Sequence, residues 1–131
     1  MNTTLDLFEA ATVALTRPAS IKDRIADAYR NYLALVDERD LPPDVCEEFR
    51  ALIHTLTRVS PQLRGDDAVR ATIRKMSNED AIEATSAVVR MYGAVSRASM
   101  LEHFAVEKHR EEEEVPTESV TNVVPLHLAA G

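Results

Sequence analysis

Apolar side chains recur three and four residues apart through most of the first 109 residues, and this spacing constrains the fold more than any other feature. Such a period places apolar groups on one face of an α-helix, whereas a half-buried strand alternates at every second residue. Glycine occurs only 3 times in 131 residues, too rarely for the tight turns of a β-sandwich or barrel. We therefore expect an all-α protein.

Helix-capping residues and prolines divide the apolar pattern into segments. A cap is expected where a short polar side chain precedes an apolar period, and a proline is accepted in the first turn of a helix but disrupts its interior. We expect about five helix starts, at Thr3 or Thr4, Ser20, Pro43, Asp66 or Asp67, and Ser77. The sequence therefore predicts a compact bundle of about five helices within residues 1–110.

The predicted core consists of the apolar face of each helix. In the first four helices the inward positions are Leu5, Phe8, Ala11 and Leu15; Ile21, Ile25, Ala28, Tyr29, Tyr32, Leu33 and Val36; Val45, Phe49, Leu52, Ile53 and Leu56, with Val59 as a further candidate; and Val69, Ile73 and Met76.

The fifth helix, over residues 78–109, changes its apolar face along its length. One stripe holds Ile82, Thr85, Val89, Tyr92 and Ser96. Leu101, Phe104 and Ala105 centre roughly 135° away from that stripe at 100° per residue. Because Gly93 and the nearby serines are weak helix formers, we expect a bend or break between Gly93 and Ser99.

Residues 111–131 differ in composition from the rest of the chain. They contain five acidic residues and no basic one, and they begin with four consecutive glutamates. Segments of this kind are typical of flexible tails. We therefore divide the chain into a helical bundle domain, 1–110, and a flexible acidic C-terminal tail, 111–131, that carries an apolar segment near its end.

Charge and cysteine content exclude several classes of protein. The formal net charge of −7 disfavours nucleic acid or an anionic membrane as a partner of the whole surface, and one cysteine cannot form an internal disulfide or a cysteine-based zinc site. No apolar run approaches the ~20 residues of a membrane-spanning helix, and the N-terminus lacks the basic start of a secretory signal. We expect a cytoplasmic protein without a membrane partner, and the excess of arginine over lysine suggests bacterial origin.

Candidate chemical groups do not form a readable catalytic or metal motif. His103 and Glu107 share a helix face, but His109 points elsewhere, so the three do not converge on one ion. Cys46 lies beside two glutamates in the first turn of a helix, an arrangement that favours a small apolar filler over a nucleophile. We predict no catalytic residue, no cofactor and no bound metal.

A locally basic segment raises the alternative of nucleic-acid binding. Residues 58–75 hold five basic and two acidic side chains, and the basic ones are Arg58, Arg64, Arg70, Arg74 and Lys75. The helix that follows begins with Asn78, Glu79 and Asp80, and the two carboxylates would repel phosphates. We therefore regard nucleic acid as an unlikely partner and assign these residues to a basic patch.

The sequence favours a non-enzymatic regulatory or adaptor protein that acts through helix faces and its C-terminal tail. Val123, Val124, Leu126 and Leu128 are the tail residues predicted to bind another protein. Homodimerisation through the last helix would involve Met100, Leu101 and Phe104. Two alternatives stay open, a nucleic-acid-associated regulator that uses segment 58–75 and a small helical enzyme without a readable motif.

Overall fold

Five α-helices and two short 3-10 helices make up the secondary structure of a computed structural model that describes the backbone of residues 3–130 and the side chains of residues 3–111. Because no strand occurs among the described residues, the predicted all-α fold is confirmed. The elements are α1 (Thr4–Ala14), α2 (Ile21–Asn31), η1 (Leu33–Leu35), η2 (Glu38–Asp40), α3 (Pro43–Thr57), α4 (Ala68–Lys75) and α5 (Asn78–Ala130). The chain divides into two units, Met1–Arg97 and Ala98–Gly131.

Each helix of the first unit begins where a side chain or a proline satisfies its first turn. The hydroxyl of Thr3 accepts a hydrogen bond from the backbone N–H of Asp6, and the Asp6 carboxylate accepts one from the Thr3 N–H, which completes a capping box. Ser20 caps α2 and Asp67 caps α4 through their side-chain oxygens. Pro43 is the first residue of α3, where its missing N–H has no cost.

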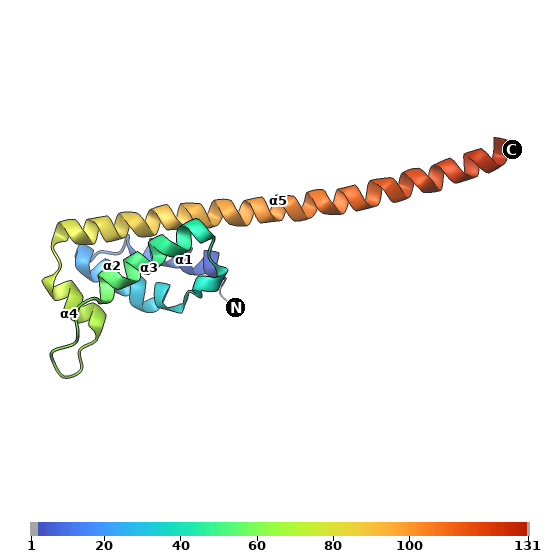
Figure 1. The fold of residues 1–131 in the computed structure, drawn as a ribbon. Coiled ribbons are helices and arrows are strands. Elements are labelled where there is room, and N and C mark those ends of the chain that lie inside the picture. Colours follow the sequence, from blue (N-terminus) through green and yellow to red (C-terminus); the bar gives the residue numbers. More distant parts are fainter. Residues whose placement is uncertain (1–2, 131) are drawn as a thin grey trace. The chain divides into compact units, whose positions relative to one another are not determined.

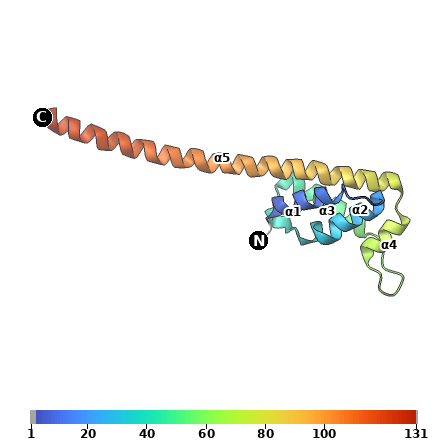
Figure 2. The ribbon, with the colours of Figure 1, turned by 180° about the vertical axis from the view of Figure 1, so that it is seen from behind.

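One apolar core joins α1, α2, α3, α4 and the first part of α5. Figures 1 and 2 show, from opposite sides, the first part of α5 lying along α1 and α3, with α4 at the end nearest the start of α5. The rings of Phe8 and Phe49 meet edge to face with centroids 6.0 Å apart. The core positions predicted for the first four helices are buried or packed against this core, except the candidate Val59, which follows the end of α3 and is half-buried.

Thr72 is a buried polar residue of α4 and is 1% exposed. Its hydroxyl donates a hydrogen bond to the Ala68 carbonyl at 2.7 Å and accepts one from the Val59 N–H at 3.0 Å. Both hydrogen-bonding capacities of the hydroxyl are therefore used, which permits its burial. The second bond ties the segment after α3 to the middle of α4.

The structure corrects two predictions for α5. The helix continues without interruption through Gly93 and Ser99, so the predicted break is wrong. No proline lies in that stretch, and glycine costs a helix only about 1 kcal/mol, which the core contacts of α5 offset. One guanidinium nitrogen of Arg97 lies 3.2 Å from the position that a Cβ atom at residue 93 would occupy, so the Arg97 side chain covers Gly93.

The face of α5 that meets the core also differs from the predicted stripe. The buried positions are Ala81, Ala84, Ala87, Val88, Met91 and Val95, whereas Ile82 and Val89 are exposed. This face mixes small alanines, which let neighbouring helices approach closely, with the larger Val88, Met91 and Val95. The predicted stripe is therefore wrong for Ile82 and Val89, whereas Tyr92 does pack against the core.

Candidate functional site

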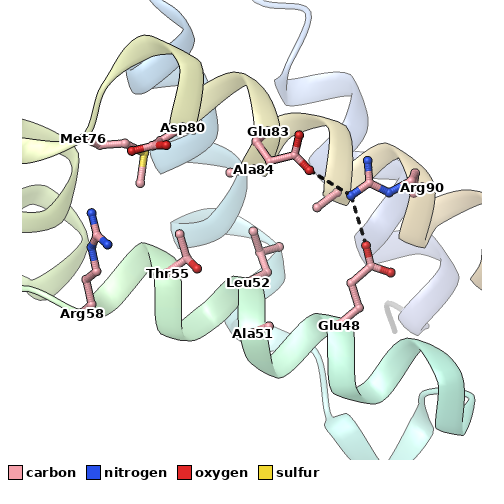
Figure 3. Close-up of a pocket in the computed structure, with 11 residues that line it drawn as sticks. Glu48, Ala51, Leu52, Thr55, Arg58, Met76, Asp80, Glu83, Ala84 and Arg90 are labelled. Atoms are coloured by element: carbon pink, nitrogen blue, oxygen red, sulfur yellow. Dashed lines mark hydrogen bonds and ion pairs between the residues drawn. The ribbon is translucent and has the colours of Figure 1, made fainter.

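A groove lies between α3 and the first part of α5 in the first unit. The volume of this groove is about 280 Å³. Figure 3 shows the two helices side by side, with Leu52 and Thr55 of α3 and Ala84 of α5 bordering the space between them. Its lining residues are Glu48, Ala51, Leu52, Thr55, Arg58, Met76, Asp80, Glu83, Ala84, Ala87 and Arg90.

The groove exists because the facing positions of its two helices carry small side chains. Ala51 lies on α3, and Ala84 and Ala87 lie on α5. The floor of the groove is apolar and consists of the buried residues Leu52, Met76, Ala84 and Ala87. Ala84 and Ala87 lie one helical turn apart on α5. Larger residues at these positions would fill the space between the helices.

Ionic contacts close one end of the groove. One guanidinium nitrogen of Arg90 lies 3.4 Å from a carboxylate oxygen of Glu48 on α3 and 3.4 Å from one of Glu83 on α5. All three side chains are partly exposed, so solvent screens these contacts and each contributes little to stability. The main effect of these contacts is to fix the position of the Arg90 side chain, because it is held between carboxylates from two different helices.

Polar groups at the other end of the groove have no such partners. Arg58 ends α3 and Asp80 lies in the first turn of α5, so the two occupy opposite walls (Figure 3). Neither side chain forms an ion pair or a hydrogen bond with another described residue. Thr55 adds a hydroxyl one turn before Arg58. This end therefore presents an uncommitted cation, an uncommitted anion and a hydroxyl.

The groove was not predicted from the sequence. Its alanines were assigned to no apolar face, and Leu52 and Met76 were assigned only to the core. A regular spacing of alanines on two neighbouring helices was the one available signal, but that signal becomes specific only when the two helices are known to pack against each other.

The predicted basic patch is partly neutralised in the structure. Arg74 forms a bidentate ion pair with Asp66, whose pKa is lowered from its usual value chiefly by this hydrogen bonding. Arg58 lines the groove, Arg64 is exposed in the loop after α3, and Arg70 and Lys75 are exposed on α4. The five residues thus lie on α3, a loop and α4, and one of them is already paired.

The second unit carries large apolar side chains in solvent. Met100, Leu101 and Phe104, the predicted oligomer contact, are 57, 69 and 60% exposed. Val106, which the sequence did not single out, is 59% exposed. Every residue from 99 to 111 is exposed. The apolar side chains in this part of α5 therefore have no buried residue next to them within that stretch.

Other candidate groups occupy ordinary structural positions. His103 and Glu107 approach to 3.1 Å on the exposed part of α5, and Cys46 is half-buried against the core. Among residues 3–111 no group of three metal-ligating side chains converges. The predicted tail contacts Val123, Val124, Leu126 and Leu128 lie outside the residues whose side chains are described, so they stay predictions.

Comparison with known proteins adds no functional assignment: no known protein family matches the sequence, and no characterised protein or solved structure gives a match to the chain. Over the described residues, no helix combines the length and apolar character needed to cross a membrane. Function must therefore be argued from the chain's own surfaces.

Proposed function

We propose that the chain is a non-enzymatic regulatory or adaptor protein that acts by binding another protein. The observation that carries this proposal is the exposed apolar side chains of α5 in the second unit, Met100, Leu101, Phe104 and Val106. Soluble proteins seldom leave several large apolar side chains exposed within two helical turns unless another molecule covers them.

The energetics of an isolated helix support the same function. Helical propensity alone stabilises a solvated helix only marginally, so a helix such as residues 99–111 gains most from burial of an apolar face. Each large side chain contributes on the order of 1–2 kcal/mol when it passes from water into an interface. Phe104 and Leu101 offer the largest apolar surfaces and are the best candidates for dominant contacts.

The basic segment supports the nucleic-acid alternative less well. Arg74 is engaged by Asp66, and the exposed first turn of α5 presents Glu79 and Asp80 beside the basic side chains of α4. Carboxylates in that position would repel phosphates and reduce affinity. Protein is therefore the favoured partner.

Affinity capture with paired variants tests the proposal. A tagged full chain would be compared with the double variant Leu101→Gln, Phe104→Gln in a lysate of the native host. Glutamine keeps helix propensity while it removes the apolar surface. The control is Leu35→Gln, which removes an equally exposed apolar side chain (66%) from η1.

We expect a captured protein that the double variant loses and the control retains. Light scattering of the purified chain distinguishes a second copy from a different protein, because self-association would double the mass in the wild type and in the control only. A monomeric wild type whose captured proteins are the same as those of the double variant would refute the proposed function.

A further inference from the structure

The groove between α3 and α5 combines three properties that ligand sites share. It is concave, its floor is apolar, and a few polar groups converge at one end. The floor consists of Leu52, Met76, Ala84 and Ala87, all of them buried. None of these residues belongs to the apolar surface of the second unit, so the groove is independent of the proposed protein-binding surface.

The charges of the groove select the chemistry of its occupant. Arg90 at the closed end is already bound by Glu48 and Glu83. Arg58 and Asp80 at the open end face each other across the groove, and no ion pair within 4.0 Å joins them or uses either of them. A ligand with both an anionic and a cationic group would engage both side chains at once.

The size of the groove limits the rest of the ligand. A volume of about 280 Å³ corresponds to the space of about nine water molecules at ~30 Å³ each, which is enough to hold an amino acid of the size of leucine. The alanines of the floor leave room for a branched aliphatic group but offer it no hydrogen bond. An apolar side chain beside a zwitterionic head therefore matches both ends of the groove.

We propose that the groove binds a free α-amino acid with a branched aliphatic side chain. The carboxylate pairs with the Arg58 guanidinium, the ammonium group pairs with the Asp80 carboxylate, and the side chain lies on Leu52, Ala84 and Ala87. Thr55 supplies a hydroxyl beside the carboxylate position. Because the groove is open and the ligand small, we expect a Kd on the order of 1 mM.

Ligands with one charge fit this arrangement less well. A carboxylic acid alone would engage Arg58 but would bring a negative charge close to Asp80, and an amine alone would leave Arg58 unpaired. The proposal therefore predicts that leucine binds more tightly than isocaproate or isoamylamine, which carry the same apolar group with only one of the two charges.

Chemical-shift titration of the full chain tests these expectations. L-Leucine should produce saturable shifts at the amides of Ala84 and Ala87, and Arg58→Gln and Asp80→Asn should each weaken its binding about tenfold. The matched control is Arg64→Gln, which removes an exposed arginine outside the groove and should leave the Kd unchanged. Both substitutions in the groove rim are at exposed positions, and circular dichroism checks that the variants stay folded.

Three outcomes would overturn the proposal. The first is an absence of saturable shifts up to about 50 mM leucine, well above the expected Kd. The second is equal binding of either single-charge analogue, which would show that the two charged side chains do not act together. The third is leucine binding that survives both rim substitutions.

Discussion

Replacement of Thr72 by valine tests how the loop after α3 is held to α4. The two side chains have nearly the same shape, so the change removes a hydroxyl from a buried site without opening a cavity. The Val59 N–H then loses its acceptor, which lies at 3.0 Å in the wild type. The hydrogen bond that the Thr72 hydroxyl donates to the Ala68 carbonyl is lost as well. This carbonyl still accepts the backbone hydrogen bond of the helix, so it is not left without a partner.

The expected cost follows from the unpaired Val59 amide. A part-buried donor without an acceptor costs about 1–3 kcal/mol, and the methyl that replaces the hydroxyl offsets part of this by apolar burial. We expect a net loss of about 1–2 kcal/mol in the free energy of unfolding. For a domain of this size that corresponds to a fall of about 4–12 °C in Tm.

Thr72→Ser is the matched control because it keeps the hydroxyl and removes only a methyl group, at a cost of about 1 kcal/mol. The two variants have similar expected stabilities, so hydrogen exchange of the Val59 amide is the discriminating measurement. We expect this amide to be protected in the wild type and in Thr72→Ser and to exchange much faster in Thr72→Val. Unchanged stability and unchanged protection of Val59 in Thr72→Val would refute the reasoning.

Two further predictions concern the core and acid stability of the first unit. Phe8→Ala should lower the free energy of unfolding by about 3–5 kcal/mol in urea denaturation, whereas Val13→Ala on the exposed side of α1 should change it by less than about 0.5 kcal/mol; similar losses would contradict the assigned core face. Hydrogen bonds from Arg39 lower the pKa of Asp37 from 3.8 to about 2, so this carboxylate favours the folded state above pH 3.8 and that contribution is lost as the pH falls from 3.8 toward 2. The pKa of the Asp37 carboxyl should be about 2 by NMR in the wild type and should rise in Arg39→Gln while staying below its ordinary value, because the backbone N–H of residue 39 still donates to this carboxylate. Equal pKa values in the two proteins would exclude the side-chain pairing.

Helix positions were largely predictable because the signals that start and stop a helix are local. A serine or aspartate before an apolar period satisfies the free N–H groups of the first turn whatever the rest of the chain does. Ser20, Asp67 and Ser77 all act as predicted. The inward faces of the first four helices were equally readable, since each has one apolar face and one charged face.

The long helix α5 shows where local signals are insufficient. Its first part has two apolar faces, one with alanines, Val88, Met91 and Val95 and one with Ile82 and Val89, and the sequence pattern alone does not decide between them. The choice depends on how closely α1 and α3 approach, which is a property of their packing. The same packing decided that Gly93 continues the helix, because core contacts on both sides of it outweigh a local cost of about 1 kcal/mol.

The sequence by itself determined the all-α class, the helix starts and the core of the first four helices. The existence of the groove depends on the tertiary structure. Arg58 and Asp80 are 22 positions apart in the sequence and lie on opposite walls of the groove only because α3 and α5 pack side by side. Helix capping and apolar periodicity depend on residues within one or two helical turns, so they can be recognised in short stretches of sequence. A surface made by two helices depends instead on their distance and crossing, which the side chains of the whole core set together.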